Sequence, residues 1–406
     1  MNTPKIRFKG FTDDWEQRKL SEICERITRK NRNNESDLPL TIASQFGLID
    51  QRDFFNKVVA AKDMSNYYLL KKGEFAYNKS YSNGFDYGSI KRLNAYKQGC
   101  LSTLYICFGI TSDEVESDYL ECFFDTLKWY GDLSMICAEG ARNHGLLNVD
   151  TKGFFDEVTV DLPKSLEEQK RISVYMNALN RLITLHQRKC DETKQLKKFM
   201  LQKMFPKNGE KNPKIRFEGF TDDWEQRKFG ELFSRRMERN LGQFDNTRWI
   251  SVARMYFQDP DRVTSNNIDT RTYVMREGDI AFEGHSNQEY RYGRFVANDI
   301  GDGVISELFP IYQHIVPYDN NYWKYAIQIE TIMAPKILRC IEISYTSSNK
   351  LDEKFFLEES TSVPGIEEQR EIGALLSNLD NLIALHQRKC EKLKALKKFM
   401  LQNMFI

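Results

Sequence analysis

Two segments of the sequence align with each other but carry different polar side chains between their matched positions. Residues 71–92 align with residues 275–297, and the positions that they share are Gly73 and Gly278, Ala76 and Ala281, Tyr87 and Tyr292, and Gly88 and Gly293. Between these positions, Asn78-Lys79-Ser80-Tyr81 stands against Glu283-Gly284-His285-Ser286. Amide, cationic, hydroxyl and imidazole groups can hydrogen-bond the base edges in the major groove of DNA. The pattern predicts one scaffold that reads two different sequences; the alternative is two surface loops that have drifted.

Two further pairs of polar segments show the same contrast. ARNHG (141–145) precedes one pair of phenylalanines, and TSSNK (346–350) precedes another. A weaker pair is IASQF (42–46) opposite VARMY (252–256). The candidate DNA contacts in the first half of the chain are Ser44, Asn78, Lys79, Ser80, Tyr81, Asn83, Arg142, Asn143 and His144. The candidates in the second half are Arg254, Glu283, His285, Ser286, Asn287, Gln288, Thr346, Ser347, Ser348, Asn349 and Lys350.

The sequence lacks the motifs of several catalytic sites. It has no GxxxxGK followed by Ser or Thr, the loop that cradles ATP phosphates, and no GxGxxG after a strand. The Asn-Pro-Pro-Tyr and Asp-Pro-Pro-Tyr motifs of amino-methyltransferases are absent as well. Asp259-Pro260-Asp261 is not followed at short range by the Glu-x-Lys of a nuclease site. We therefore expect this chain to have no catalytic residues.

Histidine and cysteine recur at one spacing in both halves. His186 and Cys190 are four residues apart, and His386 and Cys390 repeat this spacing. Four such side chains can hold zinc. The same spacing also suits packing between helices, with histidine as a polar residue that sets the register. We expect packing and no bound metal, with zinc as the alternative. The eight cysteines form no CxxC pair, which excludes zinc-ribbon and thioredoxin sites.

An internal repeat organises the whole chain. Residues 4–19 and 213–228 are identical at 15 of 16 positions, and residues 167–205 and 367–405 at 23 of 39. Each half is thus a short conserved element, a variable block and a long conserved segment. The predicted parts are a first variable domain (1–162), a first conserved helix (163–205), a polar linker (206–212), a second variable domain (213–363) and a second conserved helix (364–406).

The long conserved segments are predicted to be helices. Pro163 and Pro364 stand just before Glu-Glu-Gln, where proline can open a helix. Acidic residues lie near the expected N-terminus and lysines near the C-terminus, which is the polarity that the helix dipole favours. Apolar residues recur at spacings of three and four, at Ile172, Leu179, Leu182, Leu196 and Met200 and at Ile372, Leu375, Leu379, Leu382, Leu393, Leu396 and Met400. We expect the two helices to pack antiparallel along this seam, with His186 and His386 near its midpoint.

The composition is that of an ordinary globular protein. Of 406 residues, 41% are hydrophobic and 13% are aromatic. The sequence has neither a signal peptide at its start nor an apolar run as long as a membrane span, so we expect a cytoplasmic location. The net charge is +1, so a DNA-binding surface requires local segregation of the 59 basic residues.

Three repeated features resemble the specificity subunits of type I restriction–modification systems over the whole chain. They are the doubled WEQRK element at Trp15 and Trp224, the Glu-Glu-Gln helix starts, and the LHQRKC…LKKFMLQ helices. The resemblance implies an α+β fold, with two α/β target recognition domains separated by an antiparallel pair of long helices in an internal pseudo-twofold repeat. It also implies that each variable block contacts one half of a split DNA site. The contacts would come from loops around 78–83, 142–144, 283–288 and 346–350.

The resemblance implies partners as well. The helices would dock two modification subunits, which bring S-adenosylmethionine and methylate adenine, and restriction subunits would bring ATP and Mg²⁺ for DNA movement and cleavage. The chain itself would hold no cofactor. Two other classes stay open: an enzyme that acts alone, and a coiled-coil scaffold whose end domains bind proteins rather than DNA.

Overall fold

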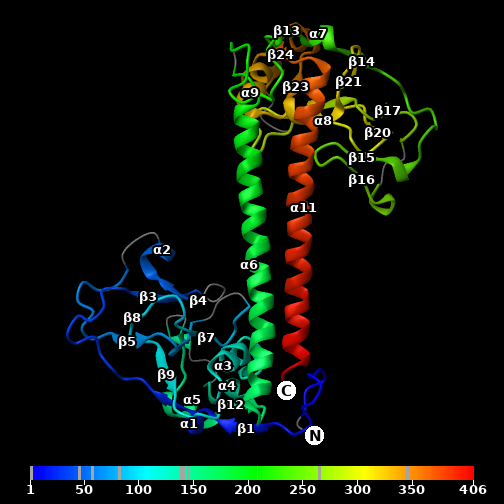
Figure 1. Cartoon of the computed structure of the whole chain (residues 1–406). Helices are drawn as coiled ribbons and strands as arrows, with labels where there is room; N and C mark the ends of the chain where they lie inside the picture. The colour runs from blue at the N-terminus through cyan, green and yellow to red at the C-terminus, as the bar shows by residue number, and fades with distance from the viewer. Residues whose placement is uncertain are drawn as a thin grey trace. The chain divides into compact units, whose positions relative to one another are not determined.

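The computed structural model (Figure 1) describes residues 3–43, 47–55, 59–80, 84–137, 142–143, 146–207, 209–263, 267–343 and 348–406, with the backbone alone at 142, 143 and 146. The chain divides into two units. The first unit contains Met1–Leu185 and Lys389–Ile406, and the second contains His186–Arg388. Each unit therefore combines one variable block with parts of both long helices.

The first unit is built on an antiparallel sheet with the strand order β2-β9-β6-β7. Its strands are β2 (Cys24–Arg26), β6 (Phe75–Asn78), β7 (Ser89–Arg92) and β9 (Ile106–Ile110). Phe75, Ala76 and Tyr77 are fully buried because β6 pairs with a strand on either side. The paired strands outside this sheet are β1 (Glu16–Lys19) with β12 (Thr159–Leu162), β3 (Leu40–Ala43) with β4 (Gly47–Asp50), β5 (Tyr68–Lys71) with β8 (Gln98–Leu101), and β10 (Arg142–Asn143) with β11 (Leu146–Leu147).

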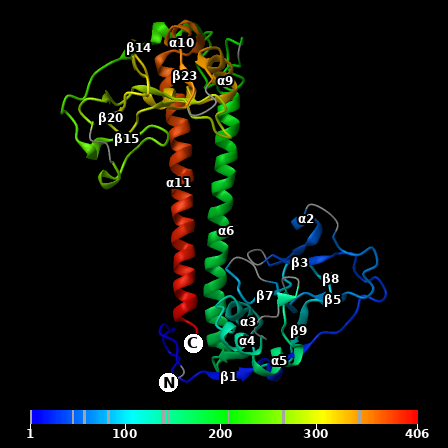
Figure 2. The ribbon, with the colours of Figure 1, turned by 180° about the vertical axis from the view of Figure 1, so that it is seen from behind.

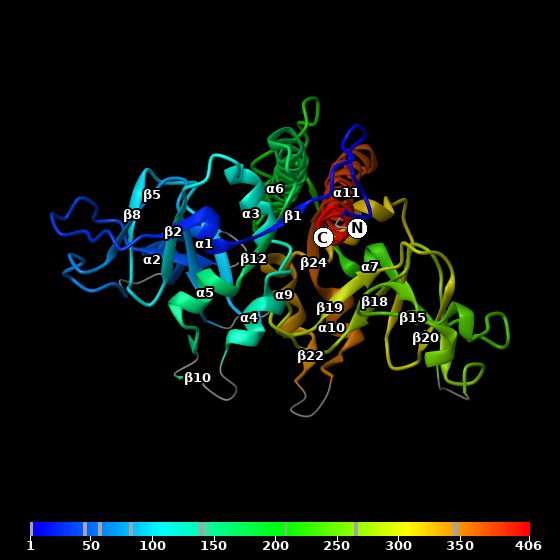
Figure 3. The same cartoon turned by 90° about the horizontal axis from the view of Figure 1, so that it is seen from below.

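Short helices cover the core of the first unit, and α3 lies beside the start of the long helix α6 (Figure 3). The glutamine Gln169 of α6 accepts a hydrogen bond from the backbone N–H of Glu116, the N-cap of α3, at 2.8 Å. The short helices that cover the core are α1 (Leu20–Ile23), α3 (Ser117–Phe124), α4 (Tyr130–Ile136) and α5 (Thr151–Glu157), whereas α2 (Gln51–Phe55) has no buried residue.

The second unit repeats this architecture with the strand order β14-β21-β18-β19. Figure 2 shows the chain from the side opposite to Figure 1. That sheet consists of β14 (Phe233–Arg236), β18 (Ile280–Glu283), β19 (Arg294–Ala297) and β21 (Ile311–His314). The other strand pairs are β13 (Glu225–Lys228) with β24 (Ser360–Val363), β15 (Ile250–Ser251) with β16 (Tyr256–Phe257), β17 (Thr272–Met275) with β20 (Gly303–Ser306), and β22 (Ile341–Glu342) with β23 (Lys350–Leu351). Its short helices are α7 (Phe229–Leu232), η1 (Asn246–Arg248), η2 (Pro260–Arg262), α8 (Asn320–Ala326), α9 (Glu330–Arg339) and α10 (Glu353–Glu358). The two variable blocks thus share one scaffold.

The predicted long helices are α6 (Leu166–Lys203) and α11 (Ile366–Asn403), each of 38 residues. Both begin where expected. Two glutamates lie in the first turn of each helix, where their negative charge is stabilised by the positive end of the helix dipole. Both end two residues earlier than the conserved segment. The pairs Met204-Phe205 and Met404-Phe405 leave the helix because they insert into the hydrophobic cores of the second and first unit, respectively.

Within each unit, α6 and α11 run antiparallel. In the second unit His186 Nδ1 lies 3.0 Å from His386 Nδ1, and Lys197 donates to Asp380 at 2.7 Å. In the first unit Cys390 Sγ lies 4.0 Å from the carbonyl oxygen of Ile183. Rising residue numbers on one helix meet falling numbers on the other, which confirms the predicted orientation.

The predicted apolar seam is wrong for part of its length. Ile372 and Leu379 are buried as expected, but Leu382 and Leu396 are 44% and 39% exposed, and Leu182 and Leu196 are both 43% exposed. A residue that the seam omits, Leu376, is fully buried. A helical period of 3.6 residues places 372, 376 and 379 on one face, and that face packs on the core of the second unit. The domain cores, not the partner helix alone, therefore select the buried face.

The repeated N-terminal elements clamp the starts of the long helices. Arg7 forms an ion pair at 2.6 Å with Glu168, which is 1% exposed, and Arg216 repeats this contact with Glu368 at 2.7 Å. Trp224 also donates from Nε1 to Glu368 at 3.1 Å. A buried carboxylate without a partner is strongly destabilising, so each copy needs both the glutamate and its arginine.

Across the described ranges, no helix combines the length and hydropathy needed to cross a bilayer.

Candidate nucleic-acid interface

The shared Tyr-Gly pair forms a tight turn in both units. Gly88 and Gly293 have positive φ angles of 79° and 87°. A Cβ atom on Gly88 would lie 2.0 Å from the carbonyl oxygen of Asn78, and one on Gly293 would lie 2.6 Å from that of Glu283. Only glycine fits this conformation and this close approach. The turns therefore hold the loops after β6 and β18 in the same position.

The first residue of each loop caps the backbone of the loop. Asn78 Oδ1 accepts a hydrogen bond from the N–H of Ser80 at 3.0 Å, and Glu283 Oε1 accepts one from the N–H of His285 at 3.1 Å. Asn78 and Glu283 occupy aligned positions, as do Ser80 and His285. The loops thus share a local geometry and differ in the side chain that it presents, a hydroxyl in one unit and an imidazole in the other.

Two sequence-predicted contacts of the second half are buried. Glu283 is 4% exposed, and its carboxylate faces His285 Nδ1 at 2.6 Å and Arg294 Nε at 3.7 Å. Asn349 is 7% exposed, and its side chain contacts Ser286 Oγ at 3.4 Å. A base edge cannot reach groups that lie inside the protein with partners of their own. We correct both assignments: Glu283 and Asn349 position their neighbours.

The second polar cluster of the second unit lies beside this loop. His285 and Ser348 form a β-bridge, and the N–H of Asn349 donates to the carbonyl of Gly284 at 3.0 Å. A Cβ atom on Gly284 would come within 2.1 Å of the Asn349 carbonyl oxygen, so the approach requires glycine. Segments more than sixty residues apart in sequence therefore present one surface.

The third, weaker candidate joins the same surface. Arg254 is exposed in the hairpin between β15 and β16, where Met255 adopts a φ of 48°. The guanidinium of Arg294 donates to the carbonyl of Ala253 in this hairpin and also faces Glu283. Arg294 therefore connects the hairpin to the end of β18. Arg294 was not among the residues predicted from the sequence; its signal was its position at the start of a strand that pairs with the loop-bearing strand.

The first unit brings its clusters together in the same way. The N–H of Leu147 in β11 donates to the carbonyl of Lys79 at 3.0 Å, and β11 pairs with β10. Lys79 aligns with Gly284, so the two units make this contact to equivalent carbonyls. Ser44, Tyr81, Asn83, His144, Thr346 and Ser347 lie outside the described residues, and Arg142 and Asn143 are described by their backbone alone.

The remaining candidates are accessible to a ligand. Arg254, His285, Ser286, Asn287, Gln288 and Lys350 are exposed in the second unit. Asn78, Lys79, Ser80 and Ser348 are half-buried. Asn287 also stabilises its own turn, because its Oδ1 accepts from the N–H groups of Glu289 and Tyr290 at 2.8 and 2.9 Å.

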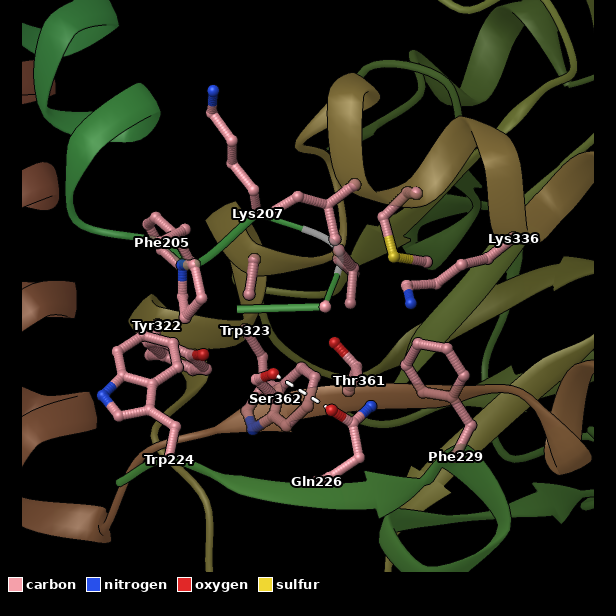
Figure 4. A pocket seen from close by; sticks show the side chains of 16 residues that line it. Phe205, Lys207, Trp224, Gln226, Phe229, Tyr322, Trp323, Lys336, Thr361 and Ser362 are labelled. Atoms are coloured by element: carbon pink, nitrogen blue, oxygen red, sulfur yellow. Dashed lines mark hydrogen bonds between the residues drawn. The ribbon is translucent and has the colours of Figure 1, made fainter. Parts of the chain in front are cut away.

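A separate pocket of the second unit lies apart from these segments, between the linker, α8, α9 and β24 (Figure 4). Its volume of about 40 Å³ is close to that of a single water molecule. Lys336 donates to the Ser360 carbonyl at 2.6 Å, and burial lowers the pKa of its ammonium group. The pocket is lined by Trp224, Trp323, Tyr322, Phe205 and Phe229.

Among the residues that the structure describes, no group of three or more His, Cys, Asp or Glu side chains could hold a metal ion.

Comparisons with known proteins bear on the fold. No protein-family model and no curated protein matches the chain. The crystal structure of a type I restriction–modification S subunit from M. genitalium matches with a TM-score of 0.59 at 12% identity, over 100% of this chain and 99% of that one. A chain from a structure that describes complex assembly and conformational transition of the type I system matches with a TM-score of 0.50 at 15% identity, over 98% and 99%. The chain therefore has the fold of a type I restriction–modification S subunit, as its sequence resemblance predicts.

Proposed function

We propose that this chain is the specificity subunit of a type I restriction–modification system and reads a bipartite, asymmetric DNA site with one recognition domain for each half. One observation carries the proposal. In both units the loop after the central strand and a distant polar hairpin meet through a hydrogen bond to equivalent carbonyls, those of Lys79 and Gly284. The scaffold is thus kept while the side chains on it change, which is what reading of two different half-sites requires.

The chemistry of the exposed side chains fits base edges and phosphates. Arg254, Lys350 and His285 supply cationic or hydrogen-bonding groups, and Gln288 supplies an amide. Arginine and lysine pair with guanine, and amides pair with adenine in the major groove. With a net charge of +1, affinity would depend on such local groups rather than on a general field.

Repeated apolar patches on the long helices support the docking of two identical partners. The first unit exposes Leu182, Leu185, Leu396 and Phe399, and the second exposes Leu382, Leu385, Leu196 and Phe199, each between 37% and 51%. Each residue of the second set is the repeat equivalent of one in the first set, 200 positions away in the sequence. Exposed leucines in register on a helix are typical of a surface that another helix covers.

The partners supply the chemistry in this proposal. Two modification subunits would cover these patches and bring S-adenosylmethionine to methylate adenine. Restriction subunits would bring ATP and Mg²⁺ for translocation and cleavage. The chain would contribute DNA specificity and no catalytic group, and it would act in the cytoplasm.

Mapping of DNA methylation tests the proposal. The chain is co-expressed with its modification subunit in a host without other adenine methylation, and all methylated sites are sequenced. We expect one motif with two unlike halves and an unread spacer, the halves centred about 10 bp apart so that both domains enter major grooves. Replacing residues 20–162 with the block of another family member should change one half alone. A palindromic motif, or a change in both halves, contradicts the proposal. Methylation without any motif would favour a scaffold.

A further inference from the structure

An exposed histidine of the second unit rests on a buried carboxylate. Glu283 Oε1 accepts hydrogen bonds from the backbone N–H of His285 at 3.1 Å and from its ring Nδ1 at 2.6 Å. The His285 side chain is 61% exposed, while that of Glu283 is 5% exposed. A carboxylate that accepts from the ring fixes its orientation and places the proton on Nδ1.

Charged groups on the neighbouring strands define the setting of this pair. From β19, Arg294 Nε lies 3.7 Å from Glu283 Oε2. Just before β23, Ser348 forms the backbone bridge with His285, and Lys350 of β23 is exposed and lies opposite Glu342 in the register with β22. Arg294 also holds the hairpin that carries Arg254. Glu283 therefore anchors two segments of the reading surface at once.

The hydrogen bond at Nδ1 leaves Nε2 for the ligand. A neutral ring held in this way offers a lone pair at Nε2, and a protonated ring offers an N–H donor. Guanine presents two acceptors, N7 and O6, in the major groove, and phosphate oxygens are acceptors as well. Histidine changes its charge between about pH 5 and 8, so one side chain can switch between the two modes.

We propose, building on the proposed function, that His285 is a specificity-determining residue whose protonated ring donates from Nε2 to an acceptor of the second half-site, a guanine edge or a phosphate, and that Glu283 is its positioning residue. Recognition of the second half-site then strengthens as the pH falls from 8 to 6. The first half-site shows no such response through this position, because Ser80 occupies it and Asn78 holds the loop without a titrating group.

The test measures DNA binding by the complex reconstituted with its modification subunits, at pH 6, 7 and 8 and constant ionic strength. Three duplexes are compared: the cognate site, a site scrambled in the first half, and a site scrambled in the second half. A charge-assisted hydrogen bond should make the affinity about tenfold higher at pH 6 than at pH 8 wherever the second half is intact. Binding to the duplex with a scrambled second half measures the pH dependence that arises elsewhere in the complex, and this dependence is the baseline.

Variants separate the roles of the two residues. His285→Gln keeps a polar, exposed side chain and should abolish the pH response above the baseline while the first-half preference stays. Glu283→Gln keeps an acceptor but removes the charge beside the ring, so the response should weaken. Ser80→Ala is the matched control in the other unit and should leave the response unchanged. Since His285 is exposed, its variant should unfold at the wild-type temperature.

Modified duplexes identify the acceptor. If 7-deazaguanine in the second half removes the response, the acceptor is a guanine; if a methylphosphonate removes it, the acceptor is a phosphate. A pH response that survives His285→Gln, or that the scrambled second half retains in full, overturns the proposal. Failure of the proposed function gives a different result, namely no preference for any half-site at any pH.

Discussion

At the scale of single residues, Asn78 shows that one polar side chain can have either of two roles. Asparagine is both a residue that addresses adenine and a residue that closes turns on its own backbone. The sequence placed Asn78 among the candidate readers, and the structure shows its Oδ1 engaged with Ser80 N–H at 3.0 Å. Residue type alone could not separate these roles. The alignment with Glu283, which makes the same local bond, shows that Asn78 holds its loop, and a DNA contact by Asn78 stays a prediction.

The neighbouring lysine is a better candidate for DNA contact. Lys79 is half-buried and uses its backbone carbonyl, not its ammonium group, to hold β11. If it contacts a base, Lys79→Ala should cost about 1–3 kcal/mol at the first half-site alone, measured as binding to cognate and half-scrambled duplexes. A phosphate contact would instead weaken all duplexes equally and reduce the salt dependence. Gly88→Val is the contrasting variant, because the clash with Asn78 should unfold the domain. Unchanged affinity for all duplexes would show that Lys79 does not contact DNA.

His314 predicts a pH dependence of stability. Its ring stacks on Tyr318 at 3.7 Å, neither ring nitrogen has a hydrogen-bond partner among the described residues, and burial lowers its pKa from 6.5 to about 3. Between these values the unfolded chain binds a proton that the folded chain does not, so stability falls as the pH falls from 6.5 towards 3. The slope from one such group is at most about 1.4 kcal/mol per pH unit.

Replacement by phenylalanine removes this titration without losing a hydrogen bond. Calorimetric unfolding of the wild type and His314→Phe between pH 7 and pH 5 should show a smaller loss of stability in the variant. The transition of the second unit should carry the difference, since His314 lies in β21. Parallel pH profiles of the two proteins would refute the assignment.

At the scale of elements, the long helices were predictable and their buried faces were not. Proline, paired glutamates and apolar spacing gave the starts of α6 and α11 because these signals are local. Leu382 was expected in the seam and is exposed, whereas Leu376 is buried, because tertiary packing on the core of the second unit selects the face. The contact of Ser348 and Asn349 with the loop after β18 was not predictable either, because it joins segments distant in sequence.

The clamp at the start of α6 makes a quantitative prediction. Arg7→Ala leaves Glu168, 1% exposed, without its ion-pair partner. Removing one member of a buried pair costs about 3–5 kcal/mol, which thermal or denaturant unfolding of the first unit would detect. Arg171→Ala is the matched control, because its pair with Glu167 is 51% and 60% exposed and should contribute little. Equal effects of the two variants would show that burial does not set the strength of the clamp.

At the scale of the whole molecule, each unit joins a helix end to a conserved element by the same hydrogen bond. The N–H of Ile215 donates to the carbonyl of Lys203 at 3.0 Å, and residues 206–212 connect the two. The N–H of Ile6 donates to the carbonyl of Asn403 at 2.9 Å in the first unit. The repeat therefore forms the same junction even where the chain does not connect its two sides.

A circular permutation tests this equivalence. Residue 405 is joined to residue 4 by a linker of the length of 206–212, and new ends are opened between residues 207 and 210, where the flanking residues are exposed. Because the same contacts exist on both sides, the permuted chain should unfold at the wild-type temperature and support methylation of the same motif. Opening the chain inside β6, which is buried, is the control that should fail. A permuted chain that does not fold would show that the two junctions are not equivalent.

The insertion of Met404 and Phe405 into the first core sets an order of events during synthesis. The other core residues of the first unit end at Leu179, and the ribosome reaches residue 404 only 225 residues later. At typical rates of about 5–20 residues per second, that interval is roughly 10 to 45 s. During it the ring of Trp15, which later meets Phe405 at 6.5 Å, has no cover from this side. The domain made first is therefore completed last, and a nascent chain interrupted before residue 404 leaves an apolar surface open to chaperones and proteases.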